Sequence, residues 1–177
     1  MSKGVYALVF SNRPCSLPVG SLGEVRFRRG WHIYVGSALG PGGFARLDRH
    51  QRLALARDRP PRWHVDRLLL SPSFTLRHLV CAPTDVDQEC DLAGILGRGG
   101  VPGFGCSDCS CESHLFYRKA DPLGEVREAM ASLGLAPVSK TIKRGEGEGG
   151  VCKWWESPGR CAGTGTPRSS SVPSSTR

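Results

Sequence analysis

The chain has 177 residues, which is enough for one domain with its own hydrophobic core and too few for two full domains. Its net charge of +8 and pI near 9.3 favour a polyanionic partner, because each arginine or lysine placed against a phosphate releases condensed counterions. Arginine outnumbers lysine nineteen to five, and its planar fork suits bidentate contacts with phosphate oxygens.

Two features of the sequence bear on localisation. The apolar run at residues 5–10 is too short for the central region of an export signal, and no small-residue cleavage site follows it. No apolar window approaches the ~18 residues that a membrane helix requires. We therefore expect a soluble, cytoplasmic protein with no membrane partner, in which the eight cysteines are free thiols or metal ligands rather than disulfides.

The first part of the chain predicts a small sheet. Residues 5–10 are apolar on both faces, as expected of a central strand that is covered on two sides. Residues 19–23 predict a hairpin turn that leads into the alternating residues 24–28. With the extended residues 31–35, these segments predict a three-stranded, mostly antiparallel sheet.

An arginine-rich helix of about four turns is predicted after the glycine turn, over residues 44–57. Arg46 and His50 lie one turn apart on it, so their side chains can point at one bound group. The window from residue 26 to 67 holds ten arginines against three aspartates, so most of the positive charge lies here. The stripe expected to dock on the sheet consists of Phe44, Leu47, Ala54 and Leu55, beside a second stripe of Arg46, His50, Leu53 and Arg57.

The rest of the chain completes an α/β (α+β) domain with helices flanking the sheet. The pattern predicts a helix at 63–70, a strand at 74–81, a helix at 86–96 that carries Glu89, and a closing strand at 115–117. We place the domain at residues 1–119, an amphipathic helix within 120–136, and a disordered tail at 137–177. In that tail 22 of 41 residues are Gly, Ser, Pro or Thr. The apolar surface that remains is too small for its burial to offset the conformational entropy lost on ordering. A small docking motif is the alternative for the tail, built on Trp154, Trp155, Cys152 and Cys161.

A family resemblance rests on residues that recur in a fixed order. Gly4-Val5-Tyr6 and Tyr34-Val35-Gly36 each lie on a predicted strand, followed by the helix with Arg46 and His50 and the later helix with Glu89. This ordered set resembles the GIY-YIG nuclease superfamily. The closest resemblance is to its Uri-type branch, small prokaryotic proteins that are sometimes fused to a DNA glycosylase. It covers roughly residues 4–117, including branch signatures similar to residues 34–43, 103–109 and 114–116.

The resemblance implies a metal-dependent endonuclease that hydrolyses phosphodiester bonds in DNA, with an association with DNA repair. Glu89 would hold a single divalent ion, Mg²⁺ above all, because carboxylate oxygen is the hard ligand that this ion prefers. Arg46 would bind the scissile phosphate, and His50 would assist proton transfer. Tyr6 or Tyr34 would act as or orient the general base, once Arg46 and the metal lower a tyrosine pKa that is ordinarily ~10. The arginines expected to contact DNA are Arg49, Arg52, Arg57 and Arg62.

Two features depart from the superfamily pattern. Tyr6 and Tyr34 are 28 residues apart, farther than is common, which indicates an inserted hairpin. The superfamily also carries an asparagine near the end of the core that supports the site, whereas the only asparagine here is Asn12. His114 is the candidate substitute.

A cysteine and histidine cluster offers a second kind of chemistry. Cys106, Cys109, Cys111 and His114 supply three thiolates and one imidazole, a donor set suited to tetrahedral zinc. The step from Cys109 to Cys111 is tight, and zinc sites usually take a second ligand pair from farther away, so free thiols packed against the glycine loop are the competing interpretation. The remaining cysteines of the domain, 15, 81 and 90, are interpreted as small hydrophobic residues. His32 and His64 are interpreted as half-buried structural residues, with secondary contacts to phosphate as the alternative.

Singly, each candidate residue has an ordinary structural explanation, and two other functions therefore stay open. One is a non-catalytic nucleic-acid-binding module, in which the basic helix grips phosphates and a zinc-supported Cys/His loop adds a surface. The other is a protein-interaction adaptor that uses Trp154 and Trp155.

Overall fold

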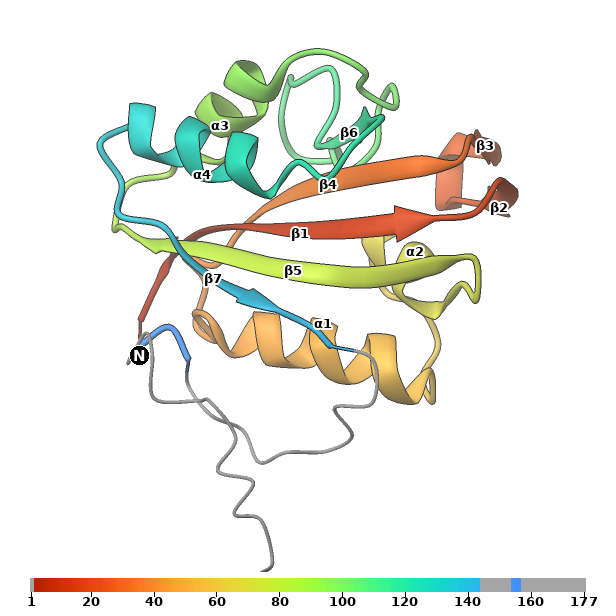
Figure 1. Ribbon diagram of the computed structural model, residues 1–177, viewed down its shortest axis with the longest axis horizontal. Coiled ribbons are helices and arrows are strands. Elements are labelled where there is room, and N and C mark those ends of the chain that lie inside the picture. The colour runs from red at the N-terminus through yellow and green to blue at the C-terminus, as the bar shows by residue number, and fades with distance from the viewer. Residues whose placement is uncertain (1, 144–153, 157–177) are drawn as a thin grey trace, which may run out of the picture.

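The computed structural model describes residues 2–143 and 154–156. An antiparallel five-stranded sheet in the order β6-β4-β1-β5-β7 forms the middle layer, with β1 at its centre (Figure 1). Its strands are β1 (Gly4–Asn12), β4 (Gly30–Ser37), β5 (Phe74–Pro83), β6 (Leu115–Arg118) and β7 (Val138–Thr141).

Helices cover both faces of this sheet. One face carries α1 (Ala45–Ala56) and α2 (His64–Leu70), and the other carries α3 (Glu89–Leu96) and α4 (Leu123–Ser132) (Figure 1). A separate two-stranded sheet of β2 (Cys15–Pro18) and β3 (Glu24–Phe27), joined by a short 3₁₀ helix at Gly20–Leu22, lies beyond the end of β1. The predicted fold class, a mixed α/β domain with a mainly antiparallel sheet, is confirmed.

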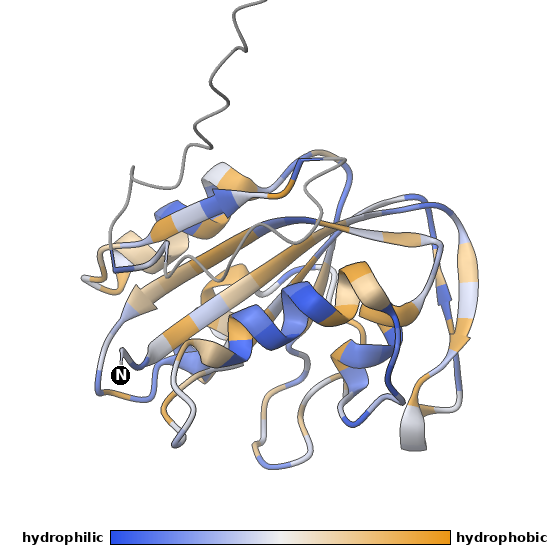
Figure 2. Cartoon of the chain, turned by 90° about the horizontal axis from the view of Figure 1, so that it is seen from below, coloured by the Kyte–Doolittle hydropathy of each residue, from blue (hydrophilic) through white to orange (hydrophobic). Residues whose placement is uncertain are grey.

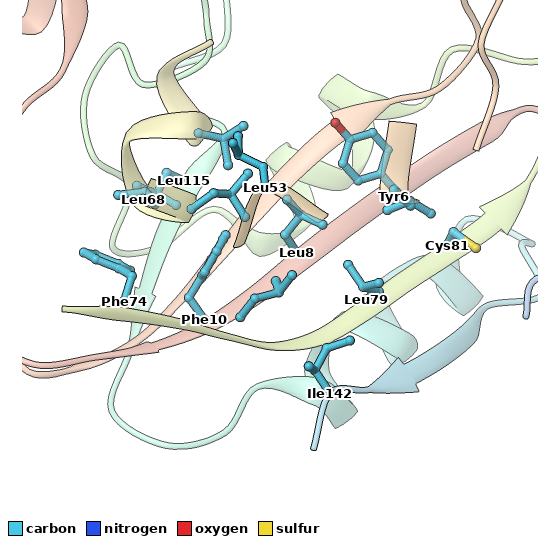
Figure 3. Packing of buried hydrophobic residues seen from close by; sticks show 14 of the residues in the cluster. Tyr6, Leu8, Phe10, Leu53, Leu68, Phe74, Leu79, Cys81, Leu115 and Ile142 are labelled. Carbon is cyan, nitrogen blue, oxygen red and sulfur yellow. The ribbon is translucent and has the colours of Figure 1, made fainter. Parts of the chain in front are cut away.

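Strand β1 is apolar on both faces because each face packs on a different helical layer. Tyr6, Leu8 and Phe10 join the core on the side of α1 and α2, where Figure 3 shows them in one row. The intervening Val5, Ala7 and Val9 join the core on the side of α3 and α4. The prediction of a central strand covered on two sides is therefore confirmed.

The predicted three-stranded sheet is wrong in strand number and in pairing. The residues of β3 pair with β2, not with β1 or β4. Strand β1 pairs directly with β4 on one edge and with β5 on the other, and β6 and β7 extend the sheet outward. The physical reason is that the buried β1 has backbone N–H and C=O groups on both of its edges that need partners. Strand β4 pairs with one edge, and the long buried β5 pairs with the other.

The tail expected from residue 137 is not disordered throughout. Strand β7 pairs with β5, and Ile142 enters the core beside it. Trp154 and Trp155 are buried, and the Trp155 ring packs at 6.1 Å from Phe44, so this pair is not an exposed docking motif. The rest of the expected tail, with Cys152 and Cys161, lies outside the described residues.

Helix α1 sits on the sheet through a stripe that matches the predicted one at Phe44, Leu47 and Ala54 but not at Leu55. Leu47, His50 and Leu53 are buried, whereas Leu55 is 50% exposed. Figure 2 shows the hydrophilic residues of α1 along its outer side. The prediction is wrong at Leu55, because rotating the helix toward His50 gives that imidazole a polar partner in the core. Among the described residues, no helix is both long and apolar enough to cross a membrane.

Candidate active site and metal cluster

Two tyrosines stand side by side on neighbouring strands. Tyr6 of β1 and Tyr34 of β4 have ring centroids 6.4 Å apart, with Tyr6 buried and Tyr34 half-buried. Tyr6 lies opposite Gly36 in the β1–β4 register. A Cβ on Gly36 would come within 2.5 Å of the Tyr6 hydroxyl, so glycine is required there to leave room for the phenol.

The Tyr6 hydroxyl is held from α1. It lies 3.1 Å from Nε2 of His50, whose side chain is fully buried. Burial lowers the pKa of His50 to about 3, with Arg49 and Arg46 acting in the same direction and Asp66 opposing them. His50 is therefore neutral at physiological pH, so its Nε2 can accept the Tyr6 proton if Nδ1 carries the ring hydrogen.

A buried aspartate stands behind His50. Asp66 of α2 lies with Oδ1 3.9 Å from His50 Nδ1, too far for a hydrogen bond but close enough for an electrostatic effect. Its carboxylate accepts two hydrogen bonds from Arg49, at 2.8 and 3.1 Å, and one from each backbone N–H of Arg62 and Trp63. Burial acts to raise the pKa of Asp66, but these bonds outweigh it and lower the pKa, so the residue is a carboxylate.

Arg46 and Glu89 bring opposite charges to the two phenols. The Arg46 guanidinium donates to the Ser37 carbonyl at 2.8 Å and lies over the Trp63 ring. Burial raises the pKa of Tyr6, and Arg46 lowers it while Glu89 raises it. Burial likewise raises the pKa of Tyr34, with Tyr6 and Glu89 adding to the increase. Arg46 therefore acts in the expected direction, but in this structure burial of the rings has the larger effect and both phenols are protonated.

The structure thus places Tyr6 beside Tyr34 and His50, with Arg46 and Glu89 close enough to act electrostatically on both phenols. Tyr6 comes from β1, Tyr34 from β4, Arg46 and His50 from α1, and Glu89 from the first turn of α3. Tyr6 and His50 form a buried pair, while Tyr34, Arg46 and Glu89 keep part of their surface exposed. Glu89, whose side chain is 21% exposed, also accepts a hydrogen bond from His114 Nδ1 at 2.7 Å.

Other polar residues singled out in the sequence have structural partners. Asn12 lies at the opposite end of β1 from Tyr6 and donates to two backbone carbonyls. Its Oδ1 lies 3.0 Å from Nδ1 of His32, which is buried and not half-buried as expected. Burial, and secondarily Arg28, lowers the pKa of His32 to about 4. His64 accepts the Gly105 N–H with its Nδ1.

The four arginines expected to contact DNA are not equivalent. Arg49 is only 29% exposed, and its guanidinium is engaged by Asp66 and stacks over Trp63. Arg52, Arg57 and Arg62 have exposed side chains on and after α1. Arg57 also ends the helix in the left-handed conformation, with its N–H bonded to the Leu53 carbonyl. Within residues 2–143 and 154–156, Arg52, Arg57 and Arg62 make no ion pair, so of the four they are the ones that can meet an outside phosphate without breaking one.

A Cys/His cluster lies beside Glu89. The ligand atoms of Cys90, Cys109, Cys111 and His114 all lie within 4.8 Å of one another, so the group can hold a metal ion. Cys90 of α3 takes the place of the expected Cys106, whose Sγ donates to the Phe104 carbonyl. The interpretation as a small hydrophobic residue is confirmed for the buried Cys81 and wrong for Cys90, which is exposed.

His114 links this cluster to Glu89. Its Nε2 lies 3.3 Å from Cys109 Sγ, while its Nδ1 contacts the Glu89 carboxylate. Burial acts to lower the pKa of His114, but the hydrogen bond to Glu89 and the nearby Cys109 raise it to about 9. His114 therefore contacts the predicted Glu89 directly, and its substitution for the superfamily's asparagine stays a prediction.

The sequence did not identify Asp66 as the neighbour of His50 or Cys90 as a member of the Cys/His cluster. Asp66 follows Trp63 by three residues, the spacing of a helix-capping carboxylate, which was the one local signal for its role. Cys90 carried no local signal, because its partners lie beyond the glycine-rich link.

The comparisons with known proteins give one finding. The family model described as "Domain of unknown function DUF123" matches residues 5–135, a range that includes the five candidate active-site residues and the Cys/His cluster. Neither a curated protein nor a solved structure matches the chain. Because the match covers well over half of its length, the chain belongs to the DUF123 family.

Proposed function

We propose that this domain is a GIY-YIG-type endonuclease that hydrolyses phosphodiester bonds in DNA, with a role in DNA repair. One observation carries the proposal: Tyr6, Tyr34, Arg46, His50 and Glu89, which come from four separate elements, meet in one cluster. Phosphodiester hydrolysis needs a proton acceptor, a cation for the phosphate and a carboxylate for a metal ion, and this cluster contains each of them.

The phenols and His50 divide the proton transfer between them. Tyr34 is the phenol with exposed surface, so it is the one that can contact and orient the attacking water. Tyr6 lies behind it, bonded to a neutral His50 that can accept its proton. The Asp66 carboxylate, 3.9 Å from Nδ1, stabilises the imidazolium that forms through its negative charge.

Arg46 binds the phosphate. One of its five N–H donors is fixed by the Ser37 carbonyl, which sets the plane of the guanidinium. The other donors remain for the non-bridging oxygens, whose negative charge grows in the transition state. Arg52, Arg57 and Arg62 extend the positive surface along the DNA backbone.

The donor set at Glu89 fits a hard divalent cation. His114 engages Oε1, so Oε2 would hold the ion, together with DNA phosphate oxygens and water, and Mg²⁺ takes such a set readily. When bound, the ion supplies Lewis-acid stabilisation of the phosphate and of the departing oxygen. The protein's own part is to hold the carboxylate in place, which the hydrogen bond from His114 does.

Nicking of supercoiled DNA in the presence of Mg²⁺ tests the proposal. Glu89→Gln keeps an acceptor for His114 but loses the charge that holds the cation, so we expect cleavage to fall by ~100-fold or more while DNA binding persists. Arg46→Ala is expected to cause a loss of similar size. Glu128→Gln on the exposed side of α4 is the matched control and should cleave like the wild type. Wild-type cleavage in Glu89→Gln would refute the assignment.

A non-catalytic DNA-binding module with a zinc-supported loop is the second candidate. The burial of Tyr6 and His50 and the raised pKa of both phenols favour it, because neither phenol is ionised in advance. It predicts binding that weakens steeply with salt and no cleavage with any divalent ion. The same nicking assay, run beside a binding titration from 50 to 200 mM salt, separates the two candidates.

A further inference from the structure

The connection between α3 and β6 contains no helix or strand beyond one isolated bridge at Gly100. It nevertheless brings Cys109, Cys111 and His114 back onto the first turn of α3, where Cys90 lies. Main-chain hydrogen bonds from the Val101 N–H to the Leu115 carbonyl and from the Gly103 N–H to the Glu112 carbonyl hold the base of this connection. Cys109 and Cys111 lie between Gly103 and Glu112, in the segment that these bonds close, where a bound metal ion would add a further constraint on the backbone.

The four side chains have the geometry of a nearly closed metal site. Tetrahedral zinc with Zn–S bonds of about 2.3 Å places neighbouring ligand atoms about 3.8 Å apart. All four ligand atoms here lie within 4.8 Å of one another, and Cys109 Sγ is 3.3 Å from His114 Nε2. Closing the site therefore needs movements on the order of 1 Å in side chains, without a change of fold.

His114 is already oriented as a metal ligand. Its backbone N–H donates to the Phe104 carbonyl and its carbonyl accepts from Val35, so its position is fixed by two main-chain bonds. Its Nδ1 faces the Glu89 carboxylate at 2.7 Å, which leaves Nε2 directed at the thiols. A metal-bound imidazole that donates its other N–H to a carboxylate is the usual outer-shell arrangement.

We propose that Cys90, Cys109, Cys111 and His114 bind one structural zinc ion, with Glu89 as the outer-shell partner of His114. Three thiolates and one imidazole form a closed donor set with no position left for water or substrate. The ion ties the loop to α3. It also fixes the carboxylate that faces Tyr6 and Tyr34, and this second consequence rests on the proposed nuclease function.

Metal content distinguishes this set from the one that the sequence suggested. Purified under reducing conditions and loaded with Zn²⁺, the wild-type chain should hold one zinc per chain by mass spectrometry of the metal. Cys90→Ser should lose at least ten-fold in zinc affinity, because one of four ligands is gone. Cys106→Ser should keep wild-type affinity. The reverse pattern, or equal loss in both variants, would overturn the proposal.

Thiol mapping on the wild-type chain gives a test that needs no variant. Zinc should slow alkylation of Cys90, Cys109 and Cys111 while Cys106 reacts at the same rate with and without the ion, as read by peptide mass spectrometry. Equal modification of all four in both states would contradict the site. Substitution by Co²⁺ should add thiolate-to-metal absorption, and its absence in the loaded protein would contradict three thiolate ligands.

Experiments can distinguish a failure of the zinc proposal from a failure of the nuclease proposal. Zinc content and alkylation do not depend on cleavage, so a zinc-loaded chain that cleaves no DNA refutes only the nuclease. Glu89→Gln should bind zinc 10–100-fold more weakly, as expected when an outer-shell partner loses its charge. Assaying that variant in excess zinc keeps the site filled, so any remaining loss of cleavage belongs to Glu89 itself.

Discussion

The two ends of the β1–β4 ladder each bury a histidine, and they differ in what surrounds it. At one end His50 contacts Tyr6, with Asp66 behind it and Arg46 beside it. At the other end His32 contacts Asn12 and is enclosed by three aromatic rings, those of Phe27, Phe74 and Tyr117.

Burial alone does not distinguish a site from a core. The pKa of both imidazoles is lowered mainly by burial, to about 3 for His50 and about 4 for His32. What differs is the neighbouring side chains: Tyr34, Arg46 and Glu89, all partly exposed, lie at the His50 end, whereas the His32 end has aromatic rings with Arg28 beyond them. A buried titratable group therefore indicates function where a cation and a carboxylate that could serve one reaction stand beside it, and not where it meets a single charge.

The largest expected effect separates the two histidines by activity. His50→Gln should lower kcat for DNA nicking ~100-fold, since proton transfer by a positioned side chain contributes 10²–10⁴-fold. His32→Gln should leave kcat of the folded fraction unchanged, because the groups proposed to react lie at the other end of the ladder. Steady-state nicking, normalised to the folded fraction from circular dichroism, measures both. An equal fall in kcat would show that the two ends are not functionally different.

A smaller effect is expected from filling the space behind the Tyr6 ring. Gly36→Ala places a methyl group within 2.5 Å of the Tyr6 hydroxyl, and overpacking of this kind costs about 1–3 kcal/mol of unfolding free energy. It should also displace Tyr6 from His50. Gly42→Ala, where an added Cβ meets nothing within 4 Å, is the matched control. Urea unfolding gives the stabilities, and a wild-type value for Gly36→Ala would mean that the ring moves without strain.

The smallest effect concerns pH, and there the two ends should behave alike. Each histidine has a folded pKa below its ordinary value near 6.5, so the unfolded chain binds a proton that the folded chain excludes. The contribution of each buried histidine to the free energy of unfolding is fully present above about pH 6.5. It declines as the pH falls toward the folded pKa, by up to about 1.4 kcal/mol per pH unit. His32→Gln and His50→Gln should each flatten this slope between about pH 6 and 4.5 in urea unfolding. A variant that keeps the wild-type slope would show that its histidine is already protonated in the folded chain.

Much of the fold could be predicted from local patterns. The strands at β1, β4, β5 and β6 and all four helices follow from periodicity, glycine punctuation and capping, which depend on residues close in the chain. The Tyr-Val-Gly motif and the one-turn spacing of Arg46 and His50 were likewise readable, because a helix or strand fixes such neighbours by itself.

Only the tertiary structure decided the rest. It paired β1 with β5 and placed β2 and β3 in a two-stranded sheet of their own. It also turned His50 inward against Tyr6, placed Asp66 behind that imidazole, and brought Cys90 instead of Cys106 beside His114. Each of these outcomes depends on which distant segments pack together, and packing is set by the summed burial of whole layers. The sequence determined which side chains were available for chemistry, and the packing of α1 and α3 on opposite faces of the sheet decided which of them meet.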